Sequence, residues 1–208
     1  VNTTSISVFT HNELSITDNL VLTFGLRYNQ DEKELSANLN SVSPSCLALQ
    51  QMETATGGAI PGVGGIVTAL QAGPLSGIMN LACNPAVNTM ANGAWAGTAE
   101  EEEFSGTISL AYHLNDDAMI YAGYSRGYKA GGFNVDRSGF QLTPATTNPA
   151  SLNVNQLAFD PEFTDAYEIG FKSTIFGGTT TFNVNVFYQL ITDYQLNAFN
   201  GFNFITRN

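Results

Sequence analysis

Few side chains in this sequence have the types and spacing that catalysis requires. His11 and His113 each stand alone on the polar side of an alternating segment, where a histidine is more often a polar wall residue than a ligand. Asp116 and Asp117 are adjacent, but aspartate in such a position favours a tight turn. The glycine-rich stretch 57–65 lacks the Lys-Ser/Thr pair of a phosphate-binding loop. We therefore predict no catalytic residue, no enzyme activity, no metal site and no cofactor.

The two cysteines, Cys46 and Cys83, fall within one loop-like region. An even pair of this kind suits a disulfide in an oxidising compartment such as a cell surface. Neither cysteine has the spacing to a second cysteine or a histidine that is typical of zinc sites. A disulfide between Cys46 and Cys83 is thus possible, and two free buried thiols are the alternative.

The charge of the chain excludes one class of partner. The net charge is -11, and the 7 basic residues are scattered, whereas a nucleic-acid surface needs clustered Lys and Arg. Charged residues make up only 12% of the sequence, about half the usual share of roughly 25%. Part of the exterior is therefore expected to face something other than water. Part of the acidity is local, in the glutamate run 100–103, which we interpret as a solvated loop.

The dominant pattern is an alternation of apolar and polar residues with the period of two that strands have. Six segments show it, although the one at 118–129 is aromatic on both faces and cannot be oriented. Each segment reaches the about 9 to 11 residues that a tilted membrane-crossing strand needs, about twice the length of a typical globular strand. The predicted strands lie at 5–16, 20–34, 104–114, 118–129, 162–176 and 179–192.

The connections between these segments alternate strictly between short and long. Tight turns are predicted at 17–19, 115–117 and 177–178, from residues that tolerate turn dihedral angles. Long segments lie between them at 36–103 and 130–161, and a third begins near 193. Outer-membrane barrels have this asymmetry, with short periplasmic turns and long extracellular loops. We therefore predict an all-β fold: an antiparallel transmembrane β-barrel segment of about six long strands, with 36–103 and 130–161 as extracellular loops.

Four of the charged residues within the predicted strands are candidates for the lumen of the barrel. Glu168 and Lys172 share one face of their strand, four residues apart. Arg27 and Arg126 are also charged residues within predicted strands, so the face that each one takes matters as well. Charge on the lipid face of a barrel is costly, so we expect all four to face the lumen. Structural ion pairs along the barrel wall are the favoured interpretation, and a role in substrate passage is the alternative.

Four stretches of the sequence resemble segments of TonB-dependent receptors, in the order and spacing of that family. The resemblance covers most of the chain outside 36–103. The four stretches are LVLTFGLRY at 20–28 with DEKE at 31–34, YAGYSRGYKAGGFN at 121–134, FDPE at 159–162 with AYEIGFK at 166–172, and VFY at 186–188 with DYQL at 193–196.

The resemblance implies a function. Receptors of this family bind a scarce ligand, usually a ferric siderophore and sometimes haem, cobalamin or a glycan, and the TonB–ExbB–ExbD system drives uptake. It implies residence in outer-membrane lipid of a Gram-negative bacterium, with the loops 36–103 and 130–161 contributing to ligand binding. The family's 22-stranded barrel and N-terminal plug domain are not visible here, so we interpret the chain as an internal piece of a longer receptor.

Two other classes of protein share part of this pattern. A passive porin or channel would show the same strands without the four stretches. A soluble or surface-attached adhesin module would have short strands and would need no detergent. An outer-membrane enzyme is disfavoured by the lack of a catalytic cluster.

Overall fold

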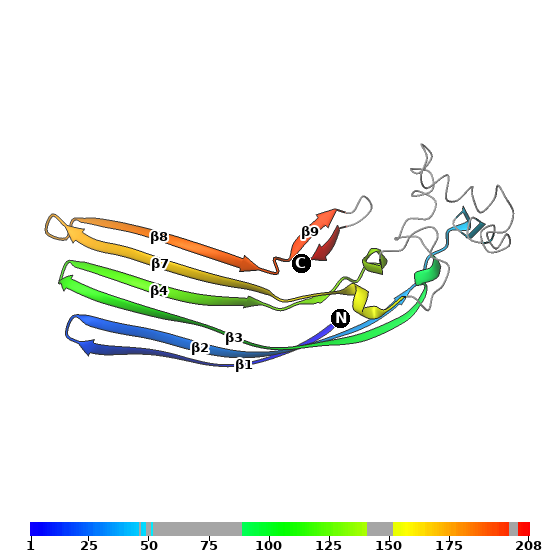
Figure 1. Ribbon diagram of the computed structural model, residues 1–208, viewed down its shortest axis with the longest axis horizontal. Helices are drawn as coiled ribbons and strands as arrows, with labels where there is room; N and C mark the ends of the chain where they lie inside the picture. The colour runs from blue at the N-terminus through cyan, green and yellow to red at the C-terminus, as the bar shows by residue number, and fades with distance from the viewer. Residues whose placement is uncertain (46, 49–50, 52–88, 141–151, 200–203) are drawn as a thin grey trace.

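A computed structural model describes residues 1–45, 47–48, 51, 89–140, 152–199 and 204–208. Its main feature is a six-stranded antiparallel sheet in the order β1-β2-β3-β4-β7-β8. Figure 1 shows these strands side by side, with the short turns at one end and the small hairpins at the other. The strands are β1 (Asn2–Thr17), β2 (Leu20–Leu39), β3 (Gly93–Asn115), β4 (Ala118–Lys129), β7 (Glu162–Ile175) and β8 (Thr180–Thr192).

The six strands predicted from alternation are confirmed, and neighbours in the main sheet follow chain order. Short turns join each hairpin as expected, and local side chains close two of them. The Thr17 hydroxyl accepts a hydrogen bond from the Leu20 amide at 3.1 Å, and the Asn115 side chain accepts one from the Asp117 amide at 2.9 Å. Gly177 and Gly178 adopt positive φ angles of 64° and 91°, which a side chain would make unfavourable.

The prediction of a loop over 36–103 is wrong at both of its ends. β2 continues to Leu39 and β3 begins at Gly93, and the two pair without interruption from Leu20↔Tyr112 to Leu39↔Gly93. The glutamate run 100–103 is therefore part of β3, not a solvated loop. Its side chains alternate: Glu101 and Glu103 are half-buried, whereas Glu100 and Glu102 are exposed. The sequence does not predict this extension because charged residues interrupt the apolar alternation there.

Smaller elements gather at the long-loop end of the sheet. Two two-stranded pairs lie there, and three short 3-10 helices are described. These elements are β5 (Gly132–Phe133) with β6 (Ala158–Phe159), β9 (Leu196–Phe199) with β10 (Phe204–Arg207), η1 (Thr89–Ala91), η2 (Arg137–Phe140) and η4 (Val154–Leu157).

A small hydrophobic core lies at this same end. Leu35 from β2 packs with Ala91, Phe140 and Leu157, all at most 2% exposed. The Trp95 ring lies 4.5 Å from the Phe140 ring between centroids. The 130–161 segment thus packs against the extended part of β2 and β3. Within the described residues, no helix is both long and apolar enough to cross a membrane.

Candidate functional site

The strand register sorts the sheet into two faces. Residues directly opposite each other on paired strands point to the same side, so each row of partners belongs to one face. The row on the apolar face includes Leu22, Leu110, Ala122, Ile169 and Val186. The adjacent row on the other face, here called the polar face, includes Thr23, Ser109, Gly123, Glu168 and Phe187.

On the polar face, Tyr121 lies between Glu168 and Lys172 of β7. Its hydroxyl donates a hydrogen bond to Glu168, which also accepts one from Asn185 Nδ2 at 2.9 Å. The Lys172 ammonium lies 5.1 Å from the centre of the Tyr121 ring. Glu168 and Lys172 therefore share a face as predicted, but they do not form the expected ion pair. Among the described residues, the one ion pair joins Arg126 to Asp165.

A glycine makes room for this arrangement. Gly170 is the cross-strand partner of Tyr121, and a β-carbon built on Gly170 would lie 2.5 Å from Cζ of the Tyr121 ring. The ring therefore lies over the bare backbone of β7, and from there its hydroxyl reaches Glu168. Sequence reasoning missed Tyr121 and Gly170. An isolated glycine within a strand pattern was the available signal, because it often marks a close approach.

Arg27 is also on the polar face, at the level where β3 and β4 separate. Its guanidinium donates to Asn29 Oδ1 at 2.6 Å and to the Ser7 hydroxyl at 2.9 Å. Asn29 in turn donates to the backbone carbonyl of Glu103 and the hydroxyl of Ser105, both at 3.3 Å. Arg27 is thus held by uncharged groups of β1 and β2, not by an acidic partner.

Arg126 lies on the apolar face, so the prediction that it shares a face with Arg27, Glu168 and Lys172 is wrong. Its cross-strand partners are Gly106 and Asp165, and Gly106 falls in phase with Phe104 and Ile108. The physical reason is that 118–129 is aromatic on both sides, so only the register with β3 and β7 reveals which face each residue takes.

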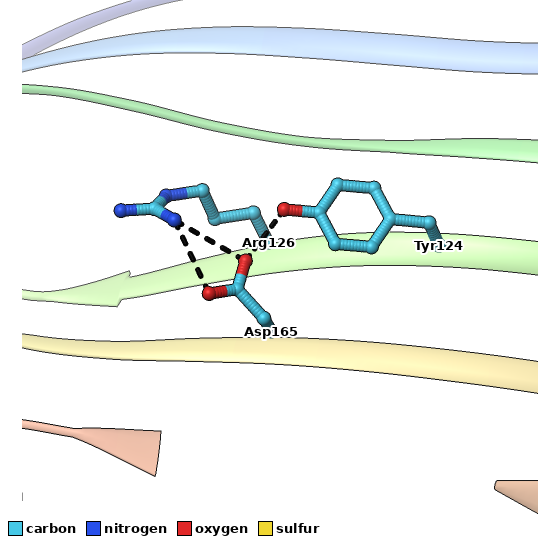
Figure 2. Close-up of polar contacts among 3 residues, drawn as sticks. All are labelled: Tyr124, Arg126 and Asp165. Atoms are coloured by element: carbon cyan, nitrogen blue, oxygen red, sulfur yellow. Dashed lines mark hydrogen bonds and ion pairs between the residues drawn. The ribbon is translucent and has the colours of Figure 1, made fainter. Parts of the chain in front are cut away.

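The carboxylate of Asp165 balances the charge of Arg126, as Figure 2 shows. One guanidinium nitrogen, Nη1, is 3.2 Å from both carboxylate oxygens of Asp165, and the Tyr124 hydroxyl donates to Asp165 Oδ1 at 2.5 Å. The guanidinium carbon also lies 4.8 Å from the centre of the Phe163 ring. The Arg126 side chain is 42% exposed and that of Asp165 17%, so the pair lies at the surface of the apolar face.

β3 and β4 separate on the long-loop side of Gly106↔Arg126, which is the last pair of their ladder. A hollow of about 480 Å³ lies at this fork. Its lining is mixed, with hydroxyl, amide and charged groups from β1, β2 and β4. The polar lining residues include Ser5, Arg27, Asn29, Asp31 and Tyr128.

A group of residues beyond the fork, here called the rim cluster, bridges the gap between the separated strands. The Tyr128 hydroxyl donates to Glu101 at 2.7 Å, and the same carboxylate accepts the Gly131 amide at 3.1 Å and 3.2 Å. Lys33 Nζ donates to the Gly131 carbonyl. Burial, and then the neighbouring Glu101 carboxylate, raise the pKa of the Tyr128 phenol, so it remains protonated and acts as a donor.

The rim cluster brings together stretches that sequence reasoning singled out separately. Lys33 belongs to the first of the four family-like stretches, and Tyr128 and Gly131 belong to the second. Glu162 of the third stretch accepts the amide of Gln195, which belongs to the fourth, at 2.8 Å. All four stretches therefore meet at the long-loop end of the sheet, around the backbone that leaves β4.

Several expectations fall outside the described residues. Cys46 and Cys83 both do, and so does most of the predicted loop 36–103. Only part of the 130–161 segment, 130–140 and 152–161, is described. Within the part of the chain that the structure describes, no group of three or more His, Cys, Asp or Glu side chains is arranged to hold a metal ion.

The fold is similar to that of receptors whose structures have been solved. The ferric yersiniabactin uptake receptor FyuA from Yersinia pestis matches with a TM-score of 0.58 and 16% identity, over 99% of this chain and 22% of that one. The siderophore receptor PiuA from Acinetobacter baumannii matches with a TM-score of 0.50 and 15% identity, over 89% of this chain and 18% of that one. This chain therefore spans about a fifth of the length of each, and at these identities the likeness concerns the fold.

Among curated proteins, no sequence match to this chain was found. The family described as TonB dependent receptor-like, beta-barrel, however, matches residues 1–208. That match covers the whole chain, including the stretches that meet at the rim cluster. This chain belongs to the TonB-dependent receptor β-barrel family.

Proposed function

We propose that this chain forms part of the barrel wall of a receptor that imports a ferric siderophore across the outer membrane of a Gram-negative bacterium. The family match over residues 1–208 carries the proposal. The receptors with a similar fold are named for ferric yersiniabactin and siderophores, which supports this ligand class for the present chain. On this proposal the barrel residues have no catalytic role.

The two faces of the sheet support a place in a membrane. The apolar face would contact lipid, and the polar face would line the lumen, because hydrocarbon offers no partner for hydroxyl, amide or charged groups. A tilted strand needs about 9 to 11 residues to cross, which the part of each strand nearest the short turns supplies. Near the end of this stretch, the rings of Tyr124 and Tyr167 pack with their centroids 5.0 Å apart, and those of Tyr28 and Phe104 with theirs 5.2 Å apart. Such rings are typical of the interface between hydrocarbon and water.

The same argument assigns the two ends. The short turns would lie in the periplasm, and the end that carries the rim cluster would be extracellular. The 36–103 and 130–161 segments would then contribute to ligand capture. Energy would come from TonB–ExbB–ExbD, acting through the N-terminal region that receptors of this family carry.

Uptake in cells tests the proposal. The full-length gene would be expressed under iron limitation in a strain without its own siderophore receptors, with and without TonB. The probes would be catecholate, hydroxamate and phenolate siderophores loaded with radioactive iron. TonB-dependent uptake of one of them, by a heat-modifiable outer-membrane protein, is the expected result. Uptake independent of TonB would indicate a passive channel, and a soluble product that needs no detergent would indicate an adhesin-like module; either would overturn the proposal.

A further inference from the structure

The 130–161 segment and the β9–β10 hairpin are joined by two side-chain amides that act as pieces of backbone. Asn134 accepts the Thr206 amide at 2.8 Å through Oδ1 and donates to the Thr206 carbonyl at 2.9 Å through Nδ2. A primary amide offers one acceptor and two donors, as a peptide group offers one of each. Asn134 therefore completes both backbone hydrogen bonds of a residue 72 positions away.

In the second contact the roles are reversed: the side chain comes from the end of the hairpin and the backbone from the 130–161 segment. Asn208, directly after β10, accepts the Asp160 amide at 2.8 Å through Oδ1 and donates to the Asp160 carbonyl at 2.9 Å through Nδ2. Each segment thus supplies one asparagine that pairs both backbone groups of one residue in the other. We call these two contacts, Asn134 with Thr206 and Asn208 with Asp160, the reciprocal joint.

Gln195 secures the base of the hairpin to the same segment. Its Nε2 donates to the carbonyls of Ala130 and Asp160, both at 3.0 Å. Ile205 of β10 is buried, at 2% exposure, and lines a pocket together with residues of the same segment. The hairpin is therefore attached on several sides to the 130–161 segment.

The 130–161 segment is in turn bound to β2 and β3 of the main sheet at Gly131. The Glu101 carboxylate and the Lys33 ammonium hold the amide and the carbonyl of this glycine. A β-carbon on Gly131 would lie 2.5 Å from Glu101 Oε1 and 2.9 Å from the Asp160 carbonyl carbon. There is no space for a side chain at Gly131, so β3 and two parts of the 130–161 segment meet there in direct contact.

We propose that the described parts of the 130–161 segment and the β9–β10 hairpin form a single docked unit, the cap, and that the reciprocal joint holds its two halves in the position needed for ligand capture. The inference about capture rests on the proposed function; the inference about docking does not. Because the joint consists of a few hydrogen bonds, each of modest net contribution, its loss should undock the two halves without unfolding the sheet.

Hydrogen exchange of the full-length receptor in detergent micelles tests the docking. Asn134→Ala should raise exchange both in peptides from 132–140 and 154–160 and in peptides from 196–207. The expected increase is about fivefold to thirtyfold. Peptides from β7 and β8 should not change. Asn38→Ala is the matched control, since Asn38 is exposed on β2 and its side chain makes no hydrogen bond with any other described residue. Asn208→Ala, made separately, should reproduce the pattern from the other side of the joint.

Exchange that rises only in the peptide carrying the substitution would overturn the single-unit proposal, as would no rise at all. Retained heat-modifiable migration would establish that the variants still fold. Binding of the radioactive iron siderophores is measured on the same samples. If the unaltered receptor binds none of them, the proposed function fails, and exchange still decides whether the cap is one unit. If the receptor binds one and both asparagine variants bind it with unchanged affinity, the role of the joint in capture is wrong.

Discussion

The part of the sheet near the short turns and the cap at its other end are stabilised in different ways. Near the turns, β1 and β8 are exposed along their whole length, and large apolar side chains such as Ile169 and Val186 remain more than 60% exposed. Under the cap, Leu35 of β2 packs with Phe140 and Leu157, and all three are at most 2% exposed. The sheet near the short turns is stabilised by hydrogen bonds between its strands and by whatever surrounds its exposed faces. The end that carries the cap also has a small hydrophobic core. The same β2–β3 hairpin serves both.

One face of β2 shows the change most directly. Thr23, Gly25 and Arg27 fall on the polar face of the sheet. Further along, Leu35 lies in the same phase and is buried under the cap, with Ala37 and Leu39 packed beside it. A strand of constant geometry thus changes its chemical surroundings within a few residues. Stability and ligand capture should therefore respond separately to substitutions in the two regions.

The largest expected effect is at the core of the cap. Replacing Phe140 by Ala removes a buried ring that contacts Trp95, and such a change costs about 3 to 5 kcal/mol. We expect local opening of the cap in hydrogen exchange while the melting temperature of the barrel changes little. Val186→Ala, on the exposed part of β8, is the control. A barrel that melts much earlier with Phe140→Ala would show that the two regions are one cooperative unit.

The second effect distinguishes the two faces of the sheet. Leu110→Arg places a charge in the middle of the apolar face, where lipid contact should cost about 2 to 4 kcal/mol. Ser109→Arg, the neighbouring position on the polar face, should cost far less. Denaturant unfolding of the full-length receptor in lipid vesicles measures both. Equal losses would contradict the assignment of the faces.

A smaller effect is expected where Tyr121 crosses Gly170. Gly170→Ala would force the ring away from β7 and from Glu168, at about 1 to 3 kcal/mol for such overpacking. Gly123→Ala is matched, because a β-carbon there would meet its neighbours at an ordinary 3.6 Å. Thermal unfolding in detergent compares the two variants. If Gly170→Ala lowers the melting temperature no more than Gly123→Ala does, the close approach of Tyr121 to Gly170 does not contribute to stability.

The smallest effect should come from the ion pair on the apolar face. Asp165→Asn removes the negative charge that pairs with Arg126 and keeps an oxygen that can accept the Tyr124 hydroxyl. Arg126 lies on the long-loop side of the interfacial ring of Tyr124, and its side chain is 42% exposed. The pair should therefore meet water, and its loss should cost about 1 kcal/mol or less. Unfolding is compared at low and high salt, and the difference should shrink as salt screens the pair. A loss of several kcal/mol would indicate that the pair is shielded from water.

The sequence by itself determined the number of strands, their alternation and the short turns. These are local properties: period-two alternation follows from strand geometry, and turn residues act on their own dihedral angles. The four family-like stretches also identified the family without any structure. Such features depend on residues within about ten positions of one another.

Only the tertiary structure decided the face of Arg126, the full length of β2 and β3, and the reciprocal joint. Arg126 took its face from the register with β3 and β7, which alternation within an aromatic strand could not reveal. The glutamate run 100–103 became strand because β2 pairs with it, not because of its composition. The contact of Asn134 with Thr206 spans 72 residues. In each case the deciding partner lies far away in the chain, so it acts only once the sheet has assembled.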